Sequence, residues 1–193
     1  VAAMRFRDRE EVVRLDVFAA YGALLGCAKK QGDALAAEVP ALVKALARQL
    51  REAKAKEGKA RMAAFGLLAQ TCGVLPSCFA EQVGSLLDAA AAALAEDAAG
   101  AGAMKVEALN FIEVLLDTHA AGDVQPHLGV LIAPLCEAAN DKYYKVAAAG
   151  LACIAQALKA VREPGGAVPA DLVTSITSVS DVVAARMAAT ECC

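Results

Sequence analysis

The seven residues Lys105-Val-Glu-Ala-Leu-Asn-Phe (105–111) carry the pattern that decides the fold, because this pattern recurs three more times along the chain. Each copy opens with a basic residue, has apolar or small residues one, three and four positions later, and continues into a run of helix-forming residues. The other copies begin at Arg14, Lys59 and Lys145. Successive copies are 45, 46 and 40 residues apart, an interval typical of HEAT helix pairs. The pattern therefore predicts stacked helical repeats.

A partner helix is predicted after each copy of the pattern, with glycine, proline or an Asn-Asp pair at the breaks. Two prolines, Pro40 and Pro134, fall within these apolar helical runs. The partner helices are predicted over 34–54, 77–96, 124–139 and 170–189, and the breaks at Gly32-Asp33, Gly58, Gly73 with Pro76, Gly100 with Gly102, Gly122-Asp123, Asn140-Asp141 and Pro164-Gly165-Gly166.

This organisation predicts an all-α fold, a HEAT-repeat superhelix (solenoid) of about eight helices. We expect a single segment over 1–193, cut from a longer array, because the first and last helices lack a partner within their own repeat. The apolar faces at the two cut ends are then expected to favour self-association. The approximate units are 1–30 (half repeat), 31–75, 76–120, 121–163 and 167–193 (half repeat).

The composition agrees with packed helices. Of the 193 residues, 58% are hydrophobic and 21% charged, which excludes intrinsic disorder. Alanine makes up about a quarter of the chain, aromatic residues are 4% and tryptophan is absent, so helices are favoured over a β-sandwich. The net charge of −3 excludes a nucleic-acid binder that relies on bulk positive charge. We therefore expect no nucleic-acid partner.

The longest uncharged stretch, 63–80, is long enough to span a membrane, but it contains Gln70, Gly73 and Pro76. These residues indicate a helix end, a turn and a new helix start rather than one continuous span. No apolar segment of the kind found in signal peptides follows the basic residues near the start. The sequence thus predicts no membrane partner.

Seven cysteines are present, an odd number with no C-x-x-C pair. Most of them lie in Ala/Leu-rich runs, where a thiol behaves as a small apolar group. We expect buried free thiols in a reducing compartment rather than a disulfide framework. The cysteines are Cys27, Cys72, Cys78, Cys136, Cys153, Cys192 and Cys193.

Groups with catalytic or metal-binding chemistry are few. The two histidines, His119 and His127, could bind a metal together with Asp117 and Asp123, but no Cys or Glu completes a recognisable ligand spacing. A solvated turn between helices is the favoured interpretation of this region. The Gly100–Ala103 stretch lacks the Lys-Ser/Thr of a phosphate-binding loop. We predict no catalytic, cofactor-binding or metal-binding residue, no cofactor, and no enzyme activity.

Three clusters of basic or aromatic residues are candidates for a partner-binding surface. The first is a group of arginines at the start of the chain, the second surrounds a predicted helix–helix turn near Lys59, and the third comes at a predicted helix start. A solvated or packed helix end is the alternative for each cluster. The predicted partner-binding residues are Arg7, Arg9, Arg14, Lys59, Lys142 and Tyr143.

Several segments, in order along the chain, resemble the central region of the cullin-associated, neddylation-dissociated (CAND) family. Together they span most of residues 5–163, whereas the stretch from Ala167 onward is only weakly similar. The sequence departs from the family in its many alanines and in a short connection between Cys27 and Asp33. The similar segments are 5–25, 38–50, the Gly73-Val-Leu-Pro76 turn, 104–112, His119, Val124-Gln-Pro-His127 and Tyr144-Lys-Val146.

This resemblance implies a HEAT-repeat superhelix that wraps around an unneddylated cullin–RING complex. It also implies a non-enzymatic scaffold that promotes the exchange of substrate-receptor modules in ubiquitin ligases, without a cofactor, in the cytoplasm and the nucleus. The alternative is another HEAT-repeat scaffold, such as a segment of a nuclear-transport receptor or of a phosphatase scaffold. The absence of tryptophan counts against a transport receptor.

Overall fold

The computed structural model describes residues 8–27, 39–52, 58–97, 100–162 and 170–190. All regular secondary structure in these ranges is helical, in eight long α-helices and three short helical turns. The long helices are α1 (Glu11–Cys27), α3 (Val39–Glu52), α4 (Gly58–Val74), α5 (Val83–Leu94), α6 (Ala101–Thr118), α8 (Leu128–Ala139), α9 (Tyr144–Arg162) and α10 (Ala170–Thr190).

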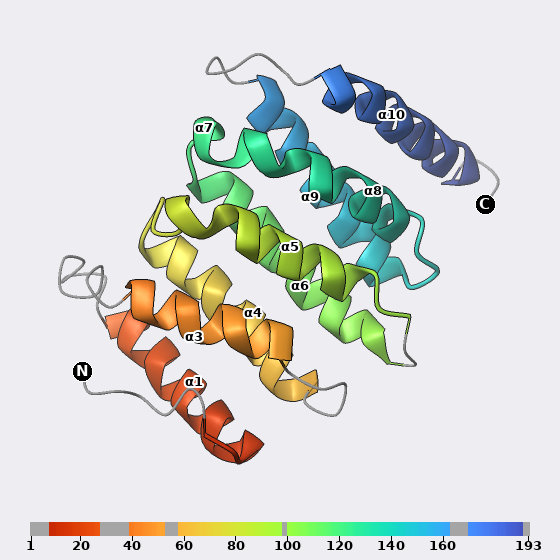
Figure 1. Ribbon diagram of the computed structural model, residues 1–193. Helices are drawn as coiled ribbons and strands as arrows, with labels where there is room; N and C mark the ends of the chain where they lie inside the picture. The colour runs from red at the N-terminus through yellow and green to blue at the C-terminus, as the bar shows by residue number, and fades with distance from the viewer. Residues whose placement is uncertain (1–7, 28–38, 53–57, 98–99, 163–169, 191–193) are drawn as a thin grey trace.

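The helices form two layers that rise in chain order (Figure 1). One layer, here called the inner layer, contains α1, α4, α6 and α9, each packed on the next. The outer layer contains α3, α5, α8 and α10, which also pack in sequence and cover the inner layer. Helices of the two layers run in opposite directions, and the N- and C-terminal helices lie at opposite ends of the stack. The predicted all-α solenoid of about eight helices is confirmed.

The core lies between the two layers and is continuous along the stack. Its largest fully buried side chains include Phe65 of α4, Phe111 of α6 and Leu87 of α5. The rings of Phe65 and Phe111 lie 5.9 Å apart between centroids, so the second and third copies of the repeated pattern pack directly on each other. Apolar residues at helical spacing thus form the face that each helix buries against its neighbours.

A glycine allows α8 and α9 to pack closely on each other. A Cβ atom at Gly150 of α9 would lie 2.7 Å from the backbone nitrogen of Ala139 and 3.0 Å from the carbonyl carbon of Ala138, both in α8. Real side chains do not approach backbone atoms so closely, and only a residue without a Cβ fits here. Gly150 therefore sets the distance between the layers in this repeat.

The predicted break at Gly122-Asp123 lies in the connection between α6 and α8, but the helix predicted over 124–139 begins only at Leu128. Helix α6 ends at Thr118, and Gly122 and Asp123 lie in a short helical turn, α7 (Ala121–Val124). A 3₁₀ turn, η4 (Gln125–His127), then leads into α8, with Pro126 in its first positions. Proline has no N–H to donate, so the chain enters α8 through this tighter turn. As expected, Pro134 lies inside α8.

The uncharged stretch 63–80 ends one helix and begins another, as predicted. Helix α4 stops at Val74, and a turn and a 3₁₀ segment, η3 (Ala80–Gln82), precede α5. A different window, Tyr144–Val161 of α9, is long and apolar enough to cross a membrane by length and composition. Core helices meet the same criteria, and α9 packs against both α6 and α8. The absence of a membrane partner stays a prediction.

Candidate functional site

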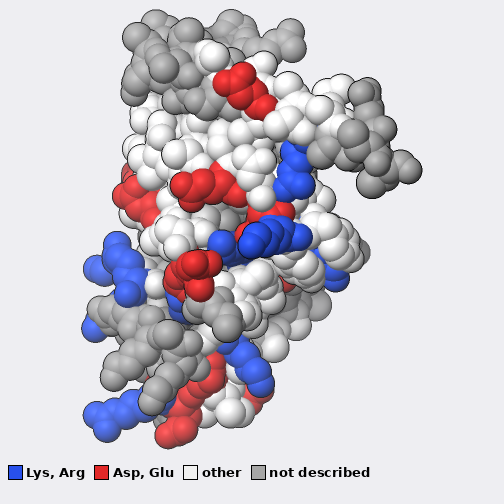
Figure 2. All heavy atoms as spheres, turned by 90° about the vertical axis from the view of Figure 1, so that its right-hand side faces the viewer, with Lys and Arg blue, Asp and Glu red and all other residues white. Residues whose placement is uncertain are grey.

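The starts of the inner-layer helices lie together along one side of the solenoid. Because each outer helix returns the chain to this side, α1, α4, α6 and α9 all begin there (Figure 1). Figure 2 faces this side and shows basic and acidic side chains interspersed down its length. We call it the helix-start edge and define it by Arg9, Lys59, Arg61, Glu96, Lys105, Asp141, Lys142, Tyr143 and Tyr144.

Two ion pairs on this edge join neighbouring repeats. Arg61 of α4 pairs with Glu96, which follows α5, and the Lys105 Nζ of α6 lies 3.5 Å from the Asp141 Oδ2 beyond α8. In each case a basic residue near the start of an inner helix meets an acidic residue after the next outer helix. Of the basic residues that open the repeated pattern, Lys105 therefore serves a contact between repeats, and Arg61 lies two residues after another of them, Lys59.

Replacing Glu96 by Gln is expected to lower the free energy of unfolding by about 1–2 kcal/mol. The Arg61 guanidinium is buried and would keep its charge without the carboxylate that neutralises it. Since the Glu96 side chain is 36% exposed, water can solvate the Arg61 charge in part once the carboxylate is gone. The loss of stability is therefore smaller than for a fully buried ion pair. Urea denaturation followed by circular dichroism measures the change. Glu137→Gln, at an exposed position of α8, is the matched control, and an equal loss there would contradict the role of the ion pair.

Arg14 is not accessible, which corrects its assignment to a partner surface. It is 5% exposed, and its Nη1 donates to the backbone carbonyls of Asp8, at 2.6 Å, and Arg9, at 3.2 Å. Its aliphatic stem and guanidinium therefore tie the chain entering α1 to that helix. Arg9 and Lys59 are exposed on the helix-start edge, whereas Arg7 lies outside the described residues.

The third predicted cluster stands at the start of α9. Lys142 is exposed, and Tyr143 and Tyr144 are 41% and 71% exposed. The two tyrosine rings meet edge to face, with centroids 5.6 Å apart. The Tyr143 N–H donates to the Asp141 Oδ1 at 2.8 Å, so a local Asx turn holds the pair at the helix start. A pocket of about 410 Å³ next to it is lined by Glu96, Asp97, Gly100, Ala101, Gly102, Ala103, Lys105, Asp141 and Tyr143.

A second, larger hollow of about 630 Å³ lies between α1 and α4. Its lining is mostly apolar and rich in small residues, with Gln70 and Glu107 as the polar groups. Small side chains keep the groove open, so a partner's apolar side chains could enter it. The remaining lining residues are Leu15, Phe18, Ala19, Gly22, Ala23, Met62, Ala63, Gly66 and Leu67.

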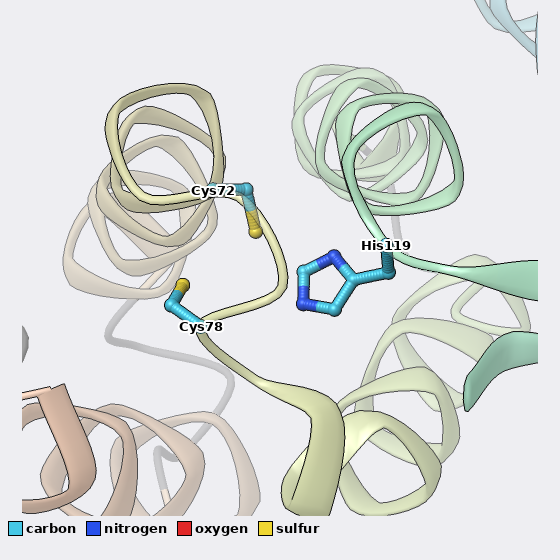
Figure 3. A group of neighbouring side chains, drawn as sticks. All are labelled: Cys72, Cys78 and His119. Atoms are coloured by element: carbon cyan, nitrogen blue, oxygen red, sulfur yellow. The ribbon is translucent and has the colours of Figure 1, made fainter.

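His119 belongs to a buried cluster, and its assignment to a solvated turn is wrong. It directly follows α6 and is 7% exposed. Its ring points toward two thiols, Cys72 in the last turn of α4 and Cys78 in the turn after it (Figure 3). One ligand atom of each residue, the two Sγ atoms and a ring nitrogen, lie within 4.8 Å of one another. His127, the other histidine, lies elsewhere, beside Gly84.

Hydrogen bonds fix the tautomer of His119. The backbone N–H of Phe79 donates to Nε2 at 3.1 Å, so Nε2 carries a lone pair. Nδ1 lies 3.1 Å from the Leu115 carbonyl oxygen, which can only accept, so Nδ1 carries the proton. Burial lowers the pKa of His119, against the opposing effects of the Leu115 carbonyl and of Asp123. The ring is therefore neutral at physiological pH.

The Cys72 thiol of the cluster is protonated. The pKa of Cys72 is raised far above its usual range, chiefly by a hydrogen bond with the Cys78 thiol and then by burial. Among the described cysteines, Cys72 and Cys153 are buried, Cys78 and Cys136 are partly buried, and Cys27 is exposed. None of these five forms a disulfide, in agreement with the expectation of free thiols, whereas the expected burial does not hold for Cys27.

The cluster escaped sequence analysis because its members lie in two different repeats. The search considered ligand spacings within one segment, whereas Cys72 and His119 are 47 residues apart. That separation is close to the repeat interval of 46 residues between Lys59 and Lys105. Equivalent positions of adjacent repeats lie side by side in a solenoid, so a search at the repeat interval would have found the pair.

Comparison with known proteins identifies the repeat family. A family model described as "CAND1-like, TPR repeats" matches residues 77–192, which include α5 to α10. The observed intervals of 40 to 46 residues are longer than the 34 residues usual for TPR units, although both kinds of repeat are helix pairs. The match covers more than half of the chain.

Curated relatives extend this similarity over the earlier helices. The chain is 32% identical over 195 residues to "Cullin-associated NEDD8-dissociated protein 1" of Arabidopsis thaliana, an alignment that covers 95% of the chain and 16% of that protein. It is 33% identical over 162 residues to "Cullin-associated NEDD8-dissociated protein 2" of Rattus norvegicus, covering 76% of the chain and 12% of that protein. The chain thus spans less than one sixth of the length of these relatives. Its helical repeats and these matches show that it belongs to the CAND1-like family.

Proposed function

We propose that the chain is part of a non-enzymatic scaffold that binds cullin–RING complexes in their unneddylated form and promotes the exchange of substrate-receptor modules in ubiquitin ligases. This proposal rests on the alignment with a protein named as cullin-associated, which covers 95% of the chain at 32% identity. The same proposal places the protein in the cytoplasm and the nucleus, and family membership alone supports this localisation. The absence of a cofactor and of a covalent step is proposed on the same ground.

The architecture supports a mechanism of competition. A two-layer helical stack offers one long continuous surface, on which a few well-placed side chains anchor one partner. A surface complementary to one state of the cullin excludes a second state, or a second protein, that needs the same area. The selectivity between cullin states is then a difference of two binding free energies.

The helix-start edge supplies contacts that suit such a partner. Tyr143 and Tyr144 are exposed aromatic side chains on a fixed turn, beside the exposed Lys142. Tyrosine buries a large area at a small entropic cost, and it is enriched at binding hot spots. We propose that Arg9, Lys59, Lys142 and Tyr143 contact the partner and that Tyr144 joins them. Arg14 is left out because it is buried.

Simultaneous replacement of Tyr143 and Tyr144 by Ala is expected to weaken binding to an unneddylated cullin–RING complex about 10-fold or more. The loss arises because two aromatic side chains no longer bury their area at the interface. Biolayer interferometry with the longer parent protein measures the affinity, and Val130→Ala, an exposed apolar residue of α8, is the matched control. Unchanged affinity in the double variant would remove this edge from the interface.

The proposal itself is tested by the same assay with unmodified and neddylated complexes. Preferential binding of the unmodified complex supports it, and no binding of either complex by the parent at micromolar concentration overturns it. If both complexes bind equally, the cullin remains the proposed partner, but the proposed preference for its unneddylated form is rejected.

Self-association of the chain stays a prediction, which light scattering checks. Its structural support is the exposure of the apolar residues Val12 and Leu24 on α1 and Met187 on α10.

A further inference from the structure

We propose that Cys72, Cys78 and His119 form a binding site for Zn²⁺ that links two successive repeats. The three residues come from the last turn of α4, the turn that follows it, and the end of α6. Their side chains converge on one point (Figure 3), with one ligand atom of each within 4.8 Å of the other two. Among the described residues, these three form the one group of His, Cys, Asp or Glu side chains that lie close enough to hold a metal ion. Each of the three offers a sulfur or an imidazole nitrogen as its ligand atom.

The donor set selects the metal. Two cysteine sulfurs and an imidazole nitrogen suit Zn²⁺, which prefers sulfur and nitrogen ligands in a tetrahedral arrangement. Mg²⁺ and Ca²⁺ require oxygen ligands and are disfavoured here. Three protein ligands leave one tetrahedral position for water, and the partly buried Cys78 provides the access to solvent.

The surroundings of His119 resemble the second shell of a metal ligand. Its Nδ1–H is held by the Leu115 carbonyl at 3.1 Å, so Nε2 is the ring nitrogen that carries a lone pair, which accepts the Phe79 N–H at 3.1 Å when no metal is bound. A metal-binding histidine commonly donates its other ring N–H to a backbone carbonyl, because this bond fixes the tautomer and the ring orientation. The nearby negative charge of Asp123 favours a cation at this site.

Binding is an exchange of protons for metal. One Zn²⁺ forms bonds to both sulfurs and to Nε2, both S–H bonds break, and two protons leave to solvent, so that the charge balances. The metal replaces the hydrogen bond between the Cys72 and Cys78 thiols and displaces the Phe79 N–H from Nε2. Proton release requires the affinity to rise with pH over the range in which the thiols are protonated.

The structural consequence is a clip between repeats. Cys72 and Cys78 hold the connection from α4 to α5, and His119 follows the helix that packs on α4. A metal bound by all three residues would restrain the relative displacement of α4 and α6. The overall curvature of a solenoid is the sum of the small rotations between neighbouring repeats. A metal at this site would therefore make the solenoid more rigid at this point and hold its local curvature constant.

The test uses the 193-residue chain with Cys27, Cys192 and Cys193 changed to Ser, so that these three cysteines do not compete with the cluster, whereas the buried Cys153 and the partly buried Cys136 are kept. Under reducing conditions, Co²⁺ is expected to bind with 1:1 stoichiometry and to show thiolate-to-cobalt charge-transfer absorption together with tetrahedral d–d bands. Zn²⁺ should then displace it. At about a hundredfold excess over its dissociation constant, Zn²⁺ should raise Tm by about 5–10 °C, whereas Mg²⁺ should not.

Variants in this background separate the proposed site from other binding. Cys78→Ser and His119→Gln are each expected to weaken Zn²⁺ binding at least about tenfold, and the Gln side chain keeps an oxygen that can accept the Phe79 N–H. Cys136→Ser, a partly buried cysteine of α8, is the control and should bind normally. Both variants are first checked for native helicity by circular dichroism. Unchanged Co²⁺ and Zn²⁺ affinity in both variants, or no charge-transfer band in the starting background, would overturn the proposal.

Discussion

Phe111→Ala is expected to lower the free energy of unfolding by about 3–5 kcal/mol. Phe111 is fully buried in α6, and its ring packs against that of Phe65 in α4. Truncation removes the transfer free energy of the ring and leaves a cavity between two adjacent repeats. Because each repeat is stabilised mainly by its neighbours, the loss should reach α4 as well as α6. Urea denaturation monitored by circular dichroism gives the change.

Two further variants calibrate that result. Phe111→Leu retains much of the apolar volume and should cost less than the alanine variant. Tyr144→Ala removes an aromatic side chain that is 71% exposed and should change stability by less than about 0.5 kcal/mol. If Phe111→Ala cost no more than Tyr144→Ala, the assignment of Phe111 to the centre of the core would be wrong.

Gly150→Ala is expected to destabilise the protein by about 1–3 kcal/mol, although alanine is the better helix former. A Cβ at this position of α9 would lie 2.7 Å from the Ala139 nitrogen in α8. Backbone atoms cannot move aside as a flexible side chain can, so the two layers must separate locally and lose packing. Differential scanning calorimetry and urea denaturation both measure this effect.

The matched control is the same substitution in the middle of another inner-layer helix. At Gly66 of α4, an added Cβ meets only the Glu107 Oε2, at an ordinary contact distance of 3.7 Å. Gly66→Ala should therefore stabilise the protein by about 0.5–1 kcal/mol through helix propensity. Opposite signs for the two variants are the expected outcome, and a stabilising Gly150→Ala would contradict the close contact between α8 and α9.

Local signals in the sequence predicted the positions of the helices well. The glycines at 58 and 100 lie at or directly before the starts of α4 and α6, and Asn140-Asp141 separates α8 from α9. These signals work because a helix end needs a residue that tolerates a turn or caps a backbone group. Gly122-Asp123 also lies between α6 and α8, but the short helical turns within that connection were not predicted, because glycine there does not by itself indicate a helical turn.

The candidate site was less predictable. Arg14 has the charge and position of an exposed basic residue, but its guanidinium bonds the carbonyls of Asp8 and Arg9 and is buried. No local pattern distinguishes a long basic side chain that folds back from one that extends into solvent. For Lys142 and Tyr143 the exposure agrees with the prediction, and their role in binding stays a prediction.

The sequence by itself determined the helices, the interval at which they repeat and the family, since each depends on residue types at short or regular spacing. Only the tertiary structure decided which equivalent positions of adjacent repeats touch. It joins Arg61 to Glu96 across repeats and brings Cys72 and Cys78 to His119. The physical reason is that these contacts depend on the offset and rotation between neighbouring helix pairs, which the packing of whole side-chain surfaces sets and no single segment encodes.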